Sequence, residues 1–254
     1  MLYWIFGQIN HPIYFRDDVL CYNDERRLKD RGIVIGGSRI PADLKTYIYN
    51  IEDIPINNIE KIRKKYKSIL EIVPSKKTRS ILIIRDPFNM FSSRHRLYLR
   101  INKIREEGGE RPFSELRNTN GNSGVAWIDD GAVELWKVYA KEFLGYTNYL
   151  GDSSLKISYN KWFSNISYRE KISKNMGLKF SDKNINYVPV NGHGSSFDVR
   201  TMNGKAQKMD VLNRWTRFSE DEKFRNIFSD KELIDLSLKI YPKITKKIIK
   251  EMGL

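Results

Sequence analysis

The stretch ILIIRDPFNMFSSRHR, residues 81–96, decides the fold class because an apolar run passes directly into a helix signal. The run SILII, residues 80–84, predicts a strand that is buried on both faces of a parallel sheet. Asp86 and Pro87 then mark a helix start, and we expect the helix to run from about Phe88 to Arg105.

Strands and helices alternate along the rest of the chain. The residue patterns predict strands at 46–51 and 154–159, and helices at 2–9, 56–72, 129–150, 168–178, 208–218 and 230–253. Alternation of this kind predicts an α/β fold in which helices flank a parallel sheet. The length of 254 residues fits a single domain, and ligands of such domains bind where the strands end.

Arg85 stands at such a strand end and is a candidate anion ligand. Its guanidinium offers a planar fork of donors, and the adjacent helix start offers unpaired backbone N–H groups. Ser93, eight positions later, adds a hydroxyl to this phosphate-site hypothesis. The alternative interpretation is that Arg85 pairs with Asp86 or with a nearby helix, and that Ser93 is an ordinary helical serine.

Composition narrows the class of partner. The net charge of +14 favours an anionic partner, although a merely soluble basic surface would also produce it. The single cysteine, Cys21, excludes an intramolecular disulfide and a cysteine zinc site. It fits a reducing compartment, so we expect a cytoplasmic protein. No apolar run reaches membrane-spanning length, and the three histidines have no metal-ligand spacing.

Three blocks of sequence resemble the sulfotransferase family, in order and in spacing. The first is the Arg85 block, which resembles the segment that binds the 3′-phosphate of the cofactor. The second, LKISYNKWFSNISYREKISKNMGL at 155–178, is similar to a strand-Tyr-Glu-Asp-Leu segment, although Asn160 and Lys161 replace the acidic pair. The third, NGHGSSFDVRTMNGKAQKMDVLNRW at 191–215, resembles the loop that closes on the same phosphate. Together they span residues 80 to 218, a range of over half of the chain.

The resemblance implies a nucleotide-kinase-like, P-loop-type fold and the cofactor 3′-phosphoadenosine 5′-phosphosulfate (PAPS). It implies that Arg85 and Ser93 hold the 3′-phosphate, and that Tyr159 touches the adenosine. It implies that the loop cradles the phosphate from the other side through Gly192, His193, Gly194, Ser195 and Ser196. A core tyrosine and a plain surface turn remain the alternatives for Tyr159 and for the loop.

The family also carries an N-terminal strand and a loop that binds the 5′-phosphosulfate. Neither precedes the helix LYWIFGQI, residues 2–9, so we expect either an incomplete sequence or a protein that lacks the loop. Transfer also needs a base. Glu52, just after the predicted strand at 46–51, is the preferred candidate, and Asp17, Asp18 and Asp53 are the alternatives.

The expected function is transfer of a sulfuryl group from PAPS to an acceptor hydroxyl, on a carbohydrate. The alternative is a non-catalytic basic protein that binds nucleic acid or another polyanion through KIRKKYKS at 61–68 and PKITKKIIK at 242–250. A phosphoryl-transfer kinase is disfavoured because the sequence contains no G-x-x-x-x-G-K-[ST] motif.

Overall fold

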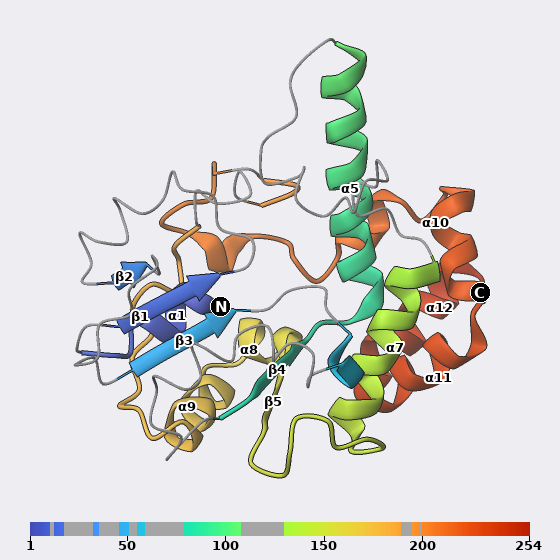
Figure 1. Ribbon diagram of the computed structural model, residues 1–254. Coiled ribbons are helices and arrows are strands. Elements are labelled where there is room, and N and C mark those ends of the chain that lie inside the picture. Colours follow the sequence, from blue (N-terminus) through green and yellow to red (C-terminus); the bar gives the residue numbers. More distant parts are fainter. Residues whose placement is uncertain are drawn as a thin grey trace.

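The structure is a computed structural model of mixed α/β class, shown in Figure 1. It describes residues 1–10, 13–17, 33–35, 46–50, 55–58, 79–107, 130–188, 195–198 and 200–254. Within these ranges, none of the helices is long and apolar enough to span a bilayer.

Every strand pair in the described residues is parallel. In one sheet β1 (Ile13–Asp17) lies between β2 (Ile33–Ile35) and β3 (Thr46–Asn50). In the other, β4 (Ile81–Ile84) pairs with β5 (Leu155–Ser158). Helices flank this second sheet, so the prediction of a parallel α/β arrangement is confirmed at the level of fold class.

Strand β4 is buried on one face only, so the prediction of burial on both faces is wrong. Leu82 and Ile84 are buried, whereas Ile81 and Ile83 are each 40% exposed. On the same face of the sheet, the neighbouring strand β5 is buried, because its Ile157 packs with Trp4 and Trp162. Among the described residues, this packing does not reach Ile81 and Ile83 of β4.

The buried face of β4 packs against the largest core. This core joins α5 (Pro87–Glu106), α7 (Asp130–Leu144), α10 (Glu222–Asn226), α11 (Lys231–Ile240) and α12 (Pro242–Met252). Phe88 at the start of α5 stacks on Phe228, with 4.3 Å between ring centroids. The first turn of α5 is therefore fixed in the core.

The C-terminal segment forms two helices, which corrects the prediction of one helix over 230–253. The break falls at Tyr241 and Pro242, because proline cannot donate the backbone hydrogen bond that would continue α11. A side-chain hydrogen bond also holds the chain at this break: the Tyr241 hydroxyl donates to the carbonyl of Ile84 over 2.8 Å. This bond ties the α11–α12 corner to the end of β4.

The predicted helix at 208–218 is also wrong. The chain forms two short 3₁₀ helices there, η5 (Ala206–Lys208) and η6 (Arg214–Arg217). Between them, the carbonyl of Leu212 accepts a hydrogen bond from the Asn89 side chain on α5 rather than from a helical amide. This contact between distant segments outweighs local helix propensity.

Of the other predicted helices, some are observed and one lies mostly outside the described residues. The helices predicted at 2–9 and 168–178 are observed as α1 (Leu2–Phe6) and α9 (Ile166–Asn175), and α8 (Tyr159–Ser164) adds a turn that was not predicted. Of the helix predicted at 56–72, the structure describes only η2 (Ile56–Asn58), and the rest lies outside the described residues.

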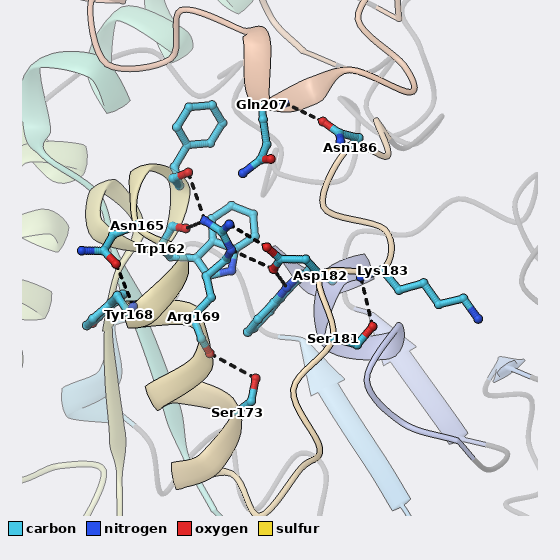
Figure 2. Close-up of polar contacts among 12 residues, drawn as sticks. Trp162, Asn165, Tyr168, Arg169, Ser173, Ser181, Asp182, Lys183, Asn186 and Gln207 are labelled. Atoms are coloured by element: carbon cyan, nitrogen blue, oxygen red, sulfur yellow. Dashed lines mark hydrogen bonds and ion pairs between the residues drawn. The ribbon is translucent and has the colours of Figure 1, made fainter.

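A partly buried ion pair joins Arg169 of α9 to Asp182, as Figure 2 shows, and the N-terminal helix contacts the same carboxylate. Arg169 of α9 donates to both carboxylate oxygens of Asp182, over 2.8 and 2.7 Å. The indole of Trp4 in α1 donates to the same carboxylate over 3.0 Å, and Arg169 also donates to the carbonyl of Trp162 over 2.9 Å. Two segments that are distant in sequence, α1 and the stretch from 162 to 182, therefore share one charged centre.

Candidate anion-binding site at the end of strand β4

The junction of β4 and α5 is built around Asp86, which begins the helix. The buried Asp86 carboxylate accepts from the backbone N–H of Asn89 over 2.8 Å, as an N-cap residue does. The amide of Asn160 donates to the same carboxylate over 2.7 Å. Burial raises the Asp86 pKa, against the lowering effect of Arg85 and of these hydrogen bonds. The cap orients both Arg85 before it and the helix after it.

Arg85 bends from the strand end toward α5. One Nη atom donates to Ser93 Oγ over 3.1 Å, and the other donates to the carbonyl of Val211. Its guanidinium carbon lies 5.2 Å from the centre of the Tyr159 ring, within reach of a cation–π contact. The Nε atom is buried without a hydrogen-bond partner in the described structure. Arg85 is bonded to Ser93 of α5, and Ser93 Oγ itself donates to the carbonyl of Asn89 over 2.9 Å, as a helical serine does. These contacts also fit the alternative interpretation, in which Arg85 pairs with a nearby helix.

Arg214 brings a second guanidinium to the same hydroxyl. Its Nη1 donates to Ser93 Oγ over 3.1 Å, and its Nη2 donates to Ser195 Oγ over 2.6 Å. Its guanidinium carbon lies 5.0 Å from the centre of the Phe197 ring. Arg214 is only 8% exposed, and its Nε atom is buried without a partner in the described structure. Burial lowers the Arg214 pKa, and the positive charge of Arg85 lowers it further.

Besides Asp86, which interacts electrostatically with Arg85, a second described carboxylate lies beside these cations, that of Asp198. It lies 3.2 Å from Arg214 Nη2 and accepts from Ser195 Oγ over 3.0 Å. Its side chain is 29% exposed, so it faces solvent more than the arginine does. Two hydroxyls and two guanidiniums, of which that of Arg214 is buried, therefore meet within hydrogen-bond distance.

The segment that carries Arg214 is held on α5 by Asn89. The Asn89 amide donates to the carbonyl of Leu212 over 2.8 Å and accepts from the backbone N–H of Trp215 over 3.3 Å. Because Asn89 lies one helical turn before Ser93, the contact sets Arg214 above that serine. The position of Arg85 is fixed in turn by Trp136, whose indole donates to the Arg85 carbonyl over 2.9 Å.

Four of the residues predicted from the sequence meet at this point: Arg85, Ser93, Tyr159 and Ser195. Ser196 follows directly, and its hydroxyl is buried without a partner among the described residues. The predicted loop residues Gly192, His193 and Gly194 and the base candidates Glu52, Asp53 and Asp18 lie outside the described residues. Asp17 is the last residue of β1, but its side chain also lies outside the described set.

Arg214, Val211 and Asp198 were not predicted from the sequence. Arg214 stands among several cations between 200 and 217, and nothing in its spacing distinguishes it from them. The one usable signal is the neighbouring Trp215, a large aromatic residue of a kind that proteins tend to bury, and it is 3% exposed. Within the described ranges, no group of three His, Cys, Asp or Glu side chains is placed to hold a metal ion.

Comparisons with protein-family models, with curated proteins and with solved structures returned no match to this chain. Any assignment of function therefore depends on the side chains of the site and on the resemblance of the three sequence blocks.

Proposed function

We propose that this protein is a PAPS-dependent sulfotransferase with a P-loop-type fold, and that it transfers a sulfuryl group to an acceptor hydroxyl on a carbohydrate. One observation supports the proposal most strongly: Arg85 and Arg214 both donate to Ser93 Oγ, each over 3.1 Å. Ser93 was selected from the sequence as a 3′-phosphate ligand, and the second arginine was not.

The chemistry of these donors fits a phosphate dianion. Two guanidiniums that converge on one neutral hydroxyl repel each other, and an anion between them would convert this repulsion into attraction. The unpartnered Nε atoms of Arg85 and Arg214 add donors that ordinary packing has not used. In the proposed complex, Arg85, Ser93, Arg214 and Ser195 hold the 3′-phosphate, and Tyr159 contacts the adenosine.

The remaining roles follow from the resemblance. The cofactor supplies the sulfuryl group when bound, and adenosine 3′,5′-bisphosphate is the product that leaves. Gly192, His193, Gly194 and Ser196 would complete the phosphate cradle, and Glu52 would accept the proton that the acceptor hydroxyl loses. Of these five residues, the structure describes only Ser196.

A thermal-shift titration tests the nucleotide site directly. A ligand that binds only the native state raises its stability, by about 2.7 kcal/mol at a hundred times its Kd. We expect adenosine 3′,5′-bisphosphate to raise the melting temperature and adenosine 5′-monophosphate to have a much smaller effect. Equal shifts for both nucleotides, or no shift from a cooperatively folded chain, would refute the 3′-phosphate assignment.

Asp198 competes with the proposed phosphate ligand for Arg214. We therefore expect that removing the Asp198 charge strengthens nucleotide binding, whereas most substitutions at a binding site weaken it. Replacing Asp198 by Asn removes a carboxylate that the phosphate would have to approach, while the amide keeps a similar shape. We expect Asp198→Asn to bind adenosine 3′,5′-bisphosphate roughly three- to tenfold more tightly, on the order of 1 kcal/mol. Calorimetric titration against the parent protein measures this change, and weaker binding would show that Asp198 orients Arg214 instead.

A further inference from the structure

The basic side chains of α5 continue from the anion site as a stripe along one face of the helix. Ser93, Arg96, Arg100 and Lys103 follow each other at intervals of three, four and three residues. At 100° per residue these positions fall within an arc of about 80°. The stripe therefore begins at the hydroxyl that both site arginines contact.

This face of α5 emerges from the protein one turn beyond Ser93. Over the first turns it is covered by the segment that carries Leu212 and Trp215, through Asn89. Arg96 is exposed, Arg100 is half-buried, and the Lys103 side chain is 73% exposed. Figure 1 shows the C-terminal half of α5 extending above the other labelled helices.

The charges of the stripe are poorly compensated. In the part of the chain that the structure describes, no carboxylate forms an ion pair with Arg96 or Arg100, and Lys103 has only the exposed Glu107 at 3.7 Å. The lysines of α7 differ. Lys137 lies 2.9 Å from Asp230 and 3.2 Å from Glu232, so its charge is neutralised within the fold.

We propose that this stripe binds an acceptor that is itself an anionic polysaccharide, beside the proposed nucleotide site. The proposal rests on the proposed function and narrows its acceptor. From Ser93 to Lys103 the helix rises about 15 Å, so the stripe matches several repeating charges of a polymer rather than one small anion. Carboxylate groups spaced along a sugar chain complement the arginines while leaving hydroxyls free to react.

The stripe is less suited to a nucleic acid. Proteins that bind single strands combine basic grooves with aromatic side chains on which bases stack. None of the four stripe positions is aromatic, and Leu97 lies beside them on the same side of the helix. A polymer with charge but without stacking bases is the better match.

The test compares two variants that change net charge equally. In the first, Arg96, Arg100 and Lys103 are all replaced by Glu. In the second, Lys243, Lys246 and Lys250 are replaced by Glu on α12, where the three lysines are exposed at the same three- and four-residue spacing. The probes are a hyaluronan oligosaccharide, neutral dextran, oligothymidylate and adenosine 3′,5′-bisphosphate, each titrated against both variants and the parent protein.

The parent is expected to bind hyaluronan and not dextran, with affinity that falls as salt rises. The α5 variant should lose about tenfold or more in hyaluronan affinity while its bisphosphate affinity changes far less, and the α12 variant should keep both. Equal losses in the two variants, or tighter binding of oligothymidylate than of hyaluronan, would overturn the proposal. If the bisphosphate binds but hyaluronan binding does not depend on the stripe, the proposed acceptor is refuted and the proposed nucleotide site is not. If hyaluronan binds at the stripe but the bisphosphate does not bind, the stripe is supported as a polyanion-binding surface and the sulfotransferase assignment is refuted.

Discussion

Arg214→Ala is expected to weaken the binding of adenosine 3′,5′-bisphosphate by about a hundredfold, equivalent to about 2.7 kcal/mol. The guanidinium is buried and places two donors on the hydroxyls of Ser93 and Ser195, where the phosphate oxygens are proposed to lie. Isothermal titration measures the affinity. Binding of adenosine 5′-monophosphate should change little, because that nucleotide has no 3′-phosphate.

Arg217→Ala is the matched control for this experiment. It removes a second arginine from the same short helix, η6, but one that is exposed. The control should retain the affinity of the parent protein. Arg85→Ala should weaken the bisphosphate by several-fold to a few hundredfold, and should leave the fold intact as judged by thermal denaturation. Unchanged affinity in both Arg85→Ala and Arg214→Ala would disprove the site.

Arg169→Ala is expected to destabilise the folded protein by about 3 kcal/mol at neutral pH. The substitution leaves the Asp182 carboxylate with only the Trp4 indole and leaves the buried carbonyl of Trp162 without its donor. Urea denaturation measures the loss. Lys171→Ala, at an exposed position on the same helix, should change stability by no more than a few tenths of a kcal/mol.

The effect of Arg169→Ala should depend on pH. Burial alone would raise the Asp182 pKa, but the hydrogen bonds from Arg169 and Trp4, together with the Arg169 charge, hold it below its ordinary value of 3.8. A depressed pKa contributes stability above 3.8, and that contribution disappears as pH falls through the folded pKa. The difference between the parent and Arg169→Ala should therefore narrow below about pH 4. A difference that stays constant into acid would mean that packing, not the ion pair, accounts for the loss.

Local patterns predicted the part of the site that lies within one strand–helix junction. The apolar run, the Asp-Pro pair and the serine eight residues after Arg85 are all visible in one short stretch, and the structure places them together. Arg214 escaped prediction because a contact with Asn89, not its own neighbours, sets its position. The exposure of Ile81 and Ile83 was not predicted for a related reason. An apolar run shows that a strand is apolar, but not whether other elements pack on one or both of its faces.

The hydrogen bond between Arg214 and Ser93 joins residues 121 positions apart. Closing a loop of that length is slow compared with forming a single helix, and it cannot begin before both ends exist. During synthesis, β4 and α5 leave the ribosome long before the segment that carries Arg214. The proposed nucleotide site therefore forms late, and a nascent chain should acquire ligand affinity only after the segment that carries Arg214 has left the ribosome.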